Sequence, residues 1–173
     1  MVMDCDEHLI DNSCNGGNMG AAFDYVKRNE GVCSEEDYPY LGDPQDCMDR
    51  SCSKVANTNI SGSVAVKSRS TEALMSSIAI GTTSVGVDAS SYDFIYYESG
   101  VFDECGTDVD HGIAAVGYDS EYGQDYWLLK NSMGTDWGEE GYMKLYREGG
   151  EDGEGVEGTC GILLNSVRPL APE

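Results

Sequence analysis

Apolar residues recur at helical spacing in two stretches of the chain. One helix is predicted to begin after Asn18, which can cap it, and to end at Gly31. Its apolar stripe consists of Met19, Ala22, Phe23 and Val26. A second helix is predicted after a cap at Ser70 or Thr71 and closes at Gly81. Its apolar positions are Leu74, Met75 and Ile78.

The rest of the chain is dominated by short runs of branched and aromatic residues, which are typical of β-strands. The predicted strands cover residues 60–66, 83–88, 110–118, 126–132, 142–146 and 162–167. An aromatic cluster follows the second of them, and its spacing favours core packing. The cluster consists of Tyr92, Phe94, Ile95, Tyr96 and Tyr97. Helices first and antiparallel strands later indicate an α+β fold.

The central pair of strands carries the most informative polar residues. His111 stands at the head of an apolar run, and Asn131 stands at the tail of the next. Residues 119–124 between them can turn the chain back. Antiparallel pairing would then bring His111 and Asn131 to the same end of a hairpin, where a strand holds side chains rigidly.

Composition narrows the classes of function. The chain has 173 residues, of which 40% are apolar, enough for a core in one domain or two small ones. A formal charge of -22 argues against nucleic acid and anionic membranes as partners. No apolar run reaches the length of a bilayer span.

Seven cysteines suggest disulfides and a secretory or lysosomal setting. The first residues lead straight into Asp4-Cys5-Asp6 without a signal peptide. A chain truncated at its N-terminus would reconcile the two. Residues 59–61 form a glycosylation sequon, which has meaning only in a secreted chain.

Four segments together resemble one family. They are residues 4–17 with Cys-Asn-Gly-Gly at their end, residues 34–40, the segment from Asp110-His111-Gly112 to Tyr142, and Gly-Thr-Cys-Gly-Ile at 158–162. In this order they resemble the papain family of cysteine proteases, of the cathepsin L type. The resemblance implies two subdomains with a substrate cleft. Residues 1–63 would be the remnant of the helical one, and 64–173 a nearly complete, barrel-like antiparallel one.

The resemblance also implies the chemistry. A cysteine protease uses a thiolate that an imidazole has deprotonated. His111 would be the general base and acid, and Asn131 would orient it. We expect the Asn131 oxygen to accept the Nδ1 proton and to leave Nε2 facing the sulfur. His8 lacks such a context and is interpreted as a surface residue.

The sequence departs from the family at two places. Met133 stands where the family has a tryptophan that shields the Asn–His bond, whereas Trp137 is retained. The nucleophile is missing, since counting back about 130 residues from His111 ends roughly 20 before Met1. We therefore predict that the chain alone has no peptidase activity.

Substrate contacts follow from the same resemblance. Gly17, beside Gly16, would present backbone groups to an extended peptide, because the missing side chain permits a close approach. A pocket for the substrate residue two before the cut bond would be lined by Met19, Gly86, Gly112 and Asn165. We expect it to prefer a large apolar or aromatic side chain. Partners would be a peptide or protein substrate, a propeptide or a cystatin-like inhibitor.

The resemblance implies a bridge between Cys105 and Cys160. Cys5 would pair with Cys47 or Cys52, and Cys33 with the other; the family favours Cys47 for Cys5. Cys14, whose partner in the family lies upstream of these residues, would remain a free thiol here.

Two alternatives stay open. A non-catalytic papain-like binding protein would also lack the nucleophile. A metal site at Cys5, His8 and Cys14, or at Cys33, Cys47 and Cys52, has spacings unlike the usual zinc pairs. We expect no metal or cofactor, and a lysosomal, vacuolar or extracellular location.

Overall fold

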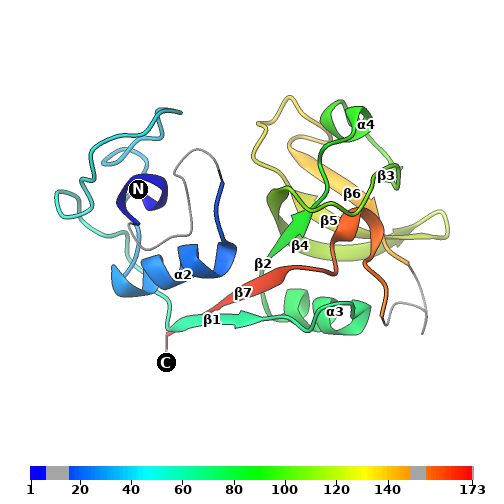
Figure 1. Ribbon diagram of the computed structural model, residues 1–173, viewed down its shortest axis with the longest axis horizontal. Coiled ribbons are helices and arrows are strands. Elements are labelled where there is room, and N and C mark those ends of the chain that lie inside the picture. Colours follow the sequence, from blue (N-terminus) through cyan, green and yellow to red (C-terminus); the bar gives the residue numbers. More distant parts are fainter. Residues whose placement is uncertain (7–15, 149–154, 173) are drawn as a thin grey trace. The chain divides into compact units, whose positions relative to one another are not determined.

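The computed structural model describes residues 1–6, 16–148 and 155–172 (Figure 1). Backbone contacts divide the chain into two units. Unit 1 comprises Met1–Val64 with Pro169–Glu173, and unit 2 comprises Ala65–Arg168.

Unit 1 contains little regular structure. Its helices are α1 (Val2–Cys5) and α2 (Met19–Arg28), and an isolated bridge joins Cys33 to Lys54. The Asn18 side chain caps α2 as predicted by accepting a hydrogen bond from the Ala21 amide at 3.1 Å. The predicted apolar stripe of α2 is only half-buried, and the buried residue of this helix is Tyr25.

Tyrosines and disulfides hold unit 1 together. Tyr25 and Tyr38 are its buried hydrophobic residues within the described part of the chain. Their hydroxyls donate to carboxylates, Tyr25 to Asp49 at 3.2 Å and Tyr38 to Asp4 at 3.1 Å. The predicted bridges Cys5–Cys47 and Cys33–Cys52 are both present, which confirms the pairing that the family resemblance favours.

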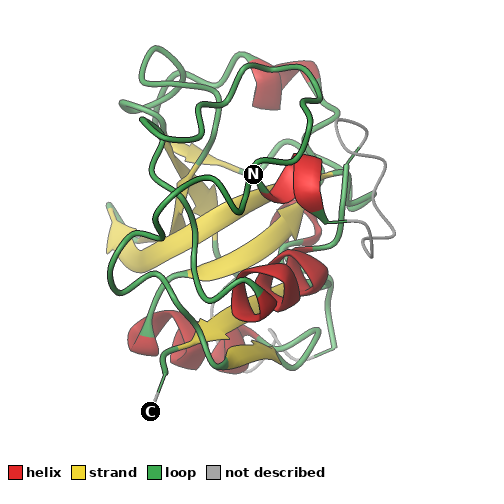
Figure 2. Cartoon of the chain, turned by 90° about the vertical axis from the view of Figure 1, so that its left-hand side faces the viewer, coloured by secondary structure: helices red, strands yellow, loops and turns green. Residues whose placement is uncertain are grey.

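The sheet has seven strands in the order β1-β7-β2-β4-β5-β6-β3. They are β1 (Gly62–Ala65), β2 (Thr83–Val87), β3 (Val101–Phe102), β4 (His111–Glu121), β5 (Gln124–Lys130), β6 (Tyr142–Tyr146) and β7 (Ser166–Leu170). The pairs β2–β4, β2–β7, β4–β5 and β5–β6 are antiparallel, and β3 runs parallel to β6. Helices and a mostly antiparallel sheet, drawn red and yellow in Figure 2, confirm the predicted α+β class.

Unit 2 also contains α3 (Thr71–Ile80), α4 (Tyr92–Ile95) and the 3₁₀ turn η3 (Thr159–Gly161). Ser70 is the cap of α3, since its hydroxyl accepts from the Ala73 amide at 3.3 Å, and Gly81 ends the helix as predicted. None of the helices in the described residues has the length and apolar character needed to cross a bilayer.

An apolar cluster fills the interior of unit 2. It consists of Leu74, Ile78, Val85, Val87, Phe94, Tyr97, Phe102, Ile113, Ala115, Trp127, Leu129, Trp137, Met143, Leu145, Cys160, Ile162 and Leu163. The prediction that the whole aromatic cluster packs in the core is wrong for Tyr92, Ile95 and Tyr96, which are 76%, 42% and 66% exposed. They lie on or just after the single-turn helix α4, which buries only Phe94.

The predicted strand at 162–167 is displaced toward the C-terminus. Strand β7 begins at Ser166, because η3 and a turn occupy the preceding residues. Cys160 and Gly161 have φ angles of 53° and 72°, which end any extended run there. Ile162 and Leu163 are nevertheless buried. The apolar pattern therefore indicated burial correctly, but these residues form a packed turn and not a strand.

Candidate active site

The hairpin of β4 and β5 positions the predicted pair. The strands pair antiparallel, with Tyr118 opposite Trp127 and Ala114 opposite Lys130. The turn consists of Tyr122 and Gly123, whose φ angles of 50° and 84° suit a tight hairpin of the I′ class. His111 opens β4 and Asn131 directly follows β5, so both lie at the same end of the hairpin, as predicted.

The two side chains are hydrogen-bonded. His111 Nε2 lies 2.9 Å from Asn131 Oδ1, so the ring nitrogen differs from the predicted one, which was Nδ1. Extending the register past Lys130 places Asn131 level with Ile113, two residues along β4 from His111. That diagonal separation is long, and Nε2, which lies farther from the backbone than Nδ1, reaches across it better. Nδ1 is therefore the nitrogen available for other chemistry.

Asn131 is held firmly. Its side chain is buried, and Oδ1 also accepts the Ser132 amide at 2.8 Å. Its backbone amide donates to Gly141 O at 2.9 Å, which ties it to the end of the following loop. Oδ1 is a carbonyl oxygen, which the bond from the Ser132 amide confirms, and it can only accept hydrogen bonds. Its bond to His111 therefore requires that Nε2 carry the proton. Nδ1 of the neutral ring is then a base.

One aromatic ring, that of Phe94, packs against His111. Phe94, which is fully buried, meets the His111 ring edge-to-face with centroids 6.3 Å apart, and it also packs against Trp137 at 5.7 Å. Trp137 is 8% exposed and its indole donates to Ile95 O at 3.0 Å. Met133, the predicted replacement shield, is 43% exposed. The sequence placed Phe94 in the core but gave no sign that it contacts His111.

Hydrogen bonds to the end of β2 and to the residues just after it hold the backbone before His111 in place. Asp110 accepts the Ala89 amide at 2.8 Å, and its own amide donates to Val87 O at 3.1 Å. The buried Asp88 carboxylate accepts from the Ser90 hydroxyl and amide and from the Asp108 amide. These donors hold the pKa of Asp88 below its usual value. The network anchors the loop that leads into His111.

Three of the predicted pocket residues come together in unit 2. Gly86 is the cross-strand partner of Gly112, and its amide donates to Asn165 O at 2.8 Å. A Cβ added at Gly86 would lie 2.6 Å from Val109, so Val109 fills the space that the missing side chain leaves. The sequence analysis did not include Val109 among the pocket residues, although it is an apolar residue only two positions before His111.

The remaining predicted contacts belong to unit 1. Met19 opens α2 and is half-buried, whereas Gly16 and Gly17 are exposed. Gly16 has a φ of 105°, a conformation that requires glycine. Their roles in substrate binding stay predictions.

All six cysteines in the described residues form disulfide bridges. Cys105 pairs with Cys160 as predicted, which ties the segment before His111 to η3. Six of the seven cysteines are therefore oxidised, and the seventh, Cys14, lies outside the described residues, as does His8.

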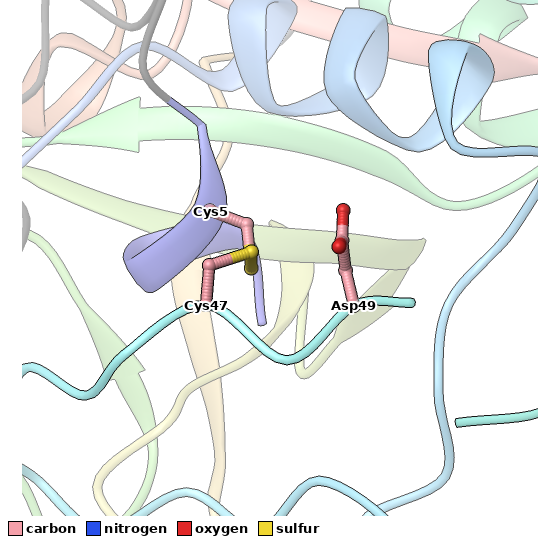
Figure 3. A group of neighbouring side chains, drawn as sticks. All are labelled: Cys5, Cys47 and Asp49. Carbon is pink, nitrogen blue, oxygen red and sulfur yellow. A yellow bond between two sulfur atoms is a disulfide. The ribbon is translucent and has the colours of Figure 1, made fainter. Parts of the chain in front are cut away.

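The alternative metal site at Cys33, Cys47 and Cys52 does not form, since Cys47 pairs with Cys5 and Cys33 with Cys52. Asp49 lies beside the Cys5–Cys47 bridge (Figure 3), within 4.8 Å of the sulfur atoms. Disulfide sulfurs are not thiolate ligands, so this group is not a metal site in the oxidised chain.

The family described as papain family cysteine protease matches residues 1–170. The chain is 42% identical over 170 residues to a KDEL-tailed cysteine endopeptidase of Arabidopsis thaliana, covering 98% of this chain and 45% of that protein. It is 44% identical over 163 residues to a second Arabidopsis thaliana cysteine protease, covering 93% and 44%. The chain thus spans about half the length of the curated relatives it matches.

Solved structures of papain-like proteases have the same fold as this chain. The bromelain protease from Ananas comosus, solved with an inhibitor, superposes with a TM-score of 0.87 at 33% identity, over 99% of this chain and 76% of that one. A ragweed pollen cysteine protease in its proform gives a TM-score of 0.86 at 34% identity, over 99% and 50%. Fold, disulfides and relatives agree: the chain belongs to the papain family of cysteine proteases.

Proposed function

We propose that this chain carries the proton-transfer half of a cysteine-type endopeptidase. The observation that carries the proposal is the bond from His111 Nε2 to Asn131 Oδ1, made by a buried amide at a rigid strand end. This bond leaves Nδ1 as the basic nitrogen. Nδ1 takes the proton of a cysteine thiol and so produces a thiolate beside an imidazolium.

The same ring completes the reaction. The thiolate sulfur attacks the carbonyl carbon of the scissile peptide bond, and the imidazolium then gives its Nδ1 proton to the departing amine. An acyl-enzyme remains, and water hydrolyses it with Nδ1 again as the base. Asn131 keeps the ring in one orientation throughout, and Phe94 packs edge-to-face against it.

We propose that the thiolate comes from outside these 173 residues. Six cysteines are in bridges, and a disulfide sulfur cannot attack as a thiolate. Cys14 lacks the Cys-Gly-Ser-Cys-Trp setting of the family's nucleophile. The chain alone is accordingly inactive, while a longer chain that supplies the nucleophile is a peptidase.

Peptides and proteins are the proposed substrates. The pocket formed by Gly86, Gly112 and Asn165, with Val109 added, would accept a large apolar or aromatic side chain. Its polar residue is uncharged, so charged side chains find no counter-ion there. Similar proteins have been solved with an inhibitor and as a proform, which supports an inhibitor or a propeptide as further partners.

A lysosomal, vacuolar or extracellular location is proposed. Three disulfides form and persist in oxidising compartments and not in the cytosol. One relative is KDEL-tailed, and because such a tail is read in the endoplasmic reticulum, that relative enters the secretory pathway that leads to these locations.

The test compares residues 1–173 with a chain extended upstream, each assayed on a fluorogenic dipeptide substrate under reducing, mildly acidic conditions. Only the extended chain is expected to cleave. His111→Ala should reduce its kcat by on the order of 10²-fold or more, since a positioned acid–base group contributes about that much. Asn131→Ala should lower kcat by a smaller factor.

Cys14→Ser is made in residues 1–173 only, because the family resemblance pairs Cys14 with an upstream cysteine in the longer chain. Activity in residues 1–173 that Cys14→Ser abolishes would overturn the proposal. An extended chain with serine or glycine at the nucleophile position and no cleavage would instead identify a papain-like binding protein.

A further inference from the structure

We propose that Asn59 is a site of N-linked glycosylation. Asn59-Ile60-Ser61 is the only Asn-X-Ser/Thr sequence in the 173 residues, where X is not proline. Three-residue matches arise often by chance, so the sequence alone carries little weight. The exposure of Asn59 and the three disulfides support the site independently of the proposed peptidase function.

Asn59 is presented to solvent. It is exposed, lies in a loop segment just before β1, and its side chain has no hydrogen-bond partner among the described residues. The backbone on either side is fixed, because Thr58 Oγ1 accepts the Val32 amide at 3.1 Å and the Ser61 amide donates to Leu170 O at 2.9 Å. A glycan on the Asn59 amide would therefore project outward and would displace no contact.

Ser61 provides the hydroxyl that the sequon requires. In the folded chain this hydroxyl donates to Ala171 O at 2.8 Å, so it is engaged once β1 has formed. The transfer must then occur before folding is complete, while residues 59–61 are still extended. That timing matches a chain that is modified as it enters the compartment in which its cysteines are oxidised.

The chemistry is a group transfer. The Asn59 side-chain nitrogen attacks the anomeric carbon of a lipid-pyrophosphate-linked oligosaccharide, forming a carbon–nitrogen bond. The carbon–oxygen bond to the pyrophosphate breaks, the lipid pyrophosphate leaves with the electron pair, and the nitrogen loses one proton. The donor and its transferase occur in the endoplasmic reticulum, where the three bridges of this chain can also form.

The test is to express the full chain behind a cleavable signal sequence in a translation system that contains endoplasmic reticulum membranes. The wild type should gain one mobility step that peptide:N-glycosidase removes, with conversion of Asn59 to aspartate seen by mass spectrometry. Asn59→Gln and Ser61→Ala should each abolish the step, and Ser61→Thr should retain it.

Asn57→Gln is the matched control, because Asn57 is exposed two residues away and lies outside the sequon. It should leave the mobility step intact. A wild-type chain that resists added protease inside the membranes, and so has been translocated, but that carries no glycan would overturn the proposal. So would a mobility step that survives Asn59→Gln. Since the readout is mass and not cleavage, failure here leaves the peptidase proposal untouched.

Discussion

Each of the two units is stabilised internally in a different way. Unit 2 has a continuous apolar cluster that runs from Leu74 to Leu163 and includes both tryptophans. Unit 1 buries only Tyr25 and Tyr38 among its described hydrophobic residues, and both use their hydroxyls to bind carboxylates. Two of the three disulfides lie in unit 1.

Disulfides contribute most to stability where a unit buries few apolar side chains. Burial stabilises by about 25 cal/mol per Å² of apolar surface, so a unit with few buried apolar side chains must limit the entropy of its unfolded state instead. Unit 1 also contains a pocket of about 770 Å³ beside the Cys5–Cys47 bridge, bordered by Tyr25 and Asp49. We infer that unit 1 depends on its bridges and that unit 2 depends on its core.

The largest effect is expected from opening the bridges of unit 1. Cys5→Ser with Cys47→Ser, and Cys33→Ser with Cys52→Ser, remove cross-links with sequence separations of 42 and 19. Each is worth about 3 to 4 kcal/mol in the chain-entropy estimate, so opening both bridges together should cost about 6 to 8 kcal/mol. Hydrogen exchange should show that α2 loses protection while β4 and β5 keep theirs. Equal loss of protection in both units would contradict the inferred difference.

Next comes the core of unit 2. Phe94→Ala removes a fully buried ring that contacts His111 and Trp137 and should cost about 3 to 5 kcal/mol. Urea unfolding followed by tryptophan fluorescence measures this directly, because Trp127 and Trp137 both belong to unit 2. Phe23→Ala, on the half-buried face of α2, is the control and should leave the fluorescence midpoint unchanged.

A smaller effect is expected at Asp88. Asp88→Asn weakens the buried carboxylate network before His111 and should cost about 1 to 3 kcal/mol at neutral pH. The pKa of Asp88 is lowered in the fold, so its charge stabilises above the ordinary value of 3.8 and ceases to do so as pH falls through the lowered pKa. The stability gap between wild type and variant should therefore close below pH 3.8; a gap that widens there would refute this.

The smallest effect is expected from Tyr38→Phe, which removes the hydroxyl donated to Asp4 and should cost unit 1 about 1 kcal/mol. Hydrogen exchange in α2 is the readout. Tyr40→Phe is matched to it, since Tyr40 is 70% exposed and its removal should change nothing measurable.

Local patterns predicted much of the fold. The caps Asn18 and Ser70, the central hairpin and the strand at 142–146 follow from residue types whose effects act over a few positions. The bridges followed from the family resemblance, since cysteine spacing alone left the pairing of Cys5 open. The same resemblance pointed to His111 and Asn131, which the structure joins by a hydrogen bond.

The errors share a different cause. Which nitrogen of His111 meets Asn131 depends on a diagonal distance across two strands, and no sequence pattern encodes it. Ile162 and Leu163 looked like a strand because a packed turn and a buried strand both require apolar residues. Phe94 and Tyr92 are alike in composition, yet the single turn of α4 buries one and exposes the other.

The role of His111 as the base depends on the proton carried by Nε2, and nitrogen-15 NMR of the imidazole rings measures that proton. The chain has two histidines, so a His8→Gln variant leaves His111 as the only ring signal. In the neutral form we expect a protonated Nε2 and an unprotonated Nδ1, and we expect Asn131→Ala to abolish this preference. A proton on Nδ1 in the wild type would contradict the assignment of Asn131 as the residue that orients the base.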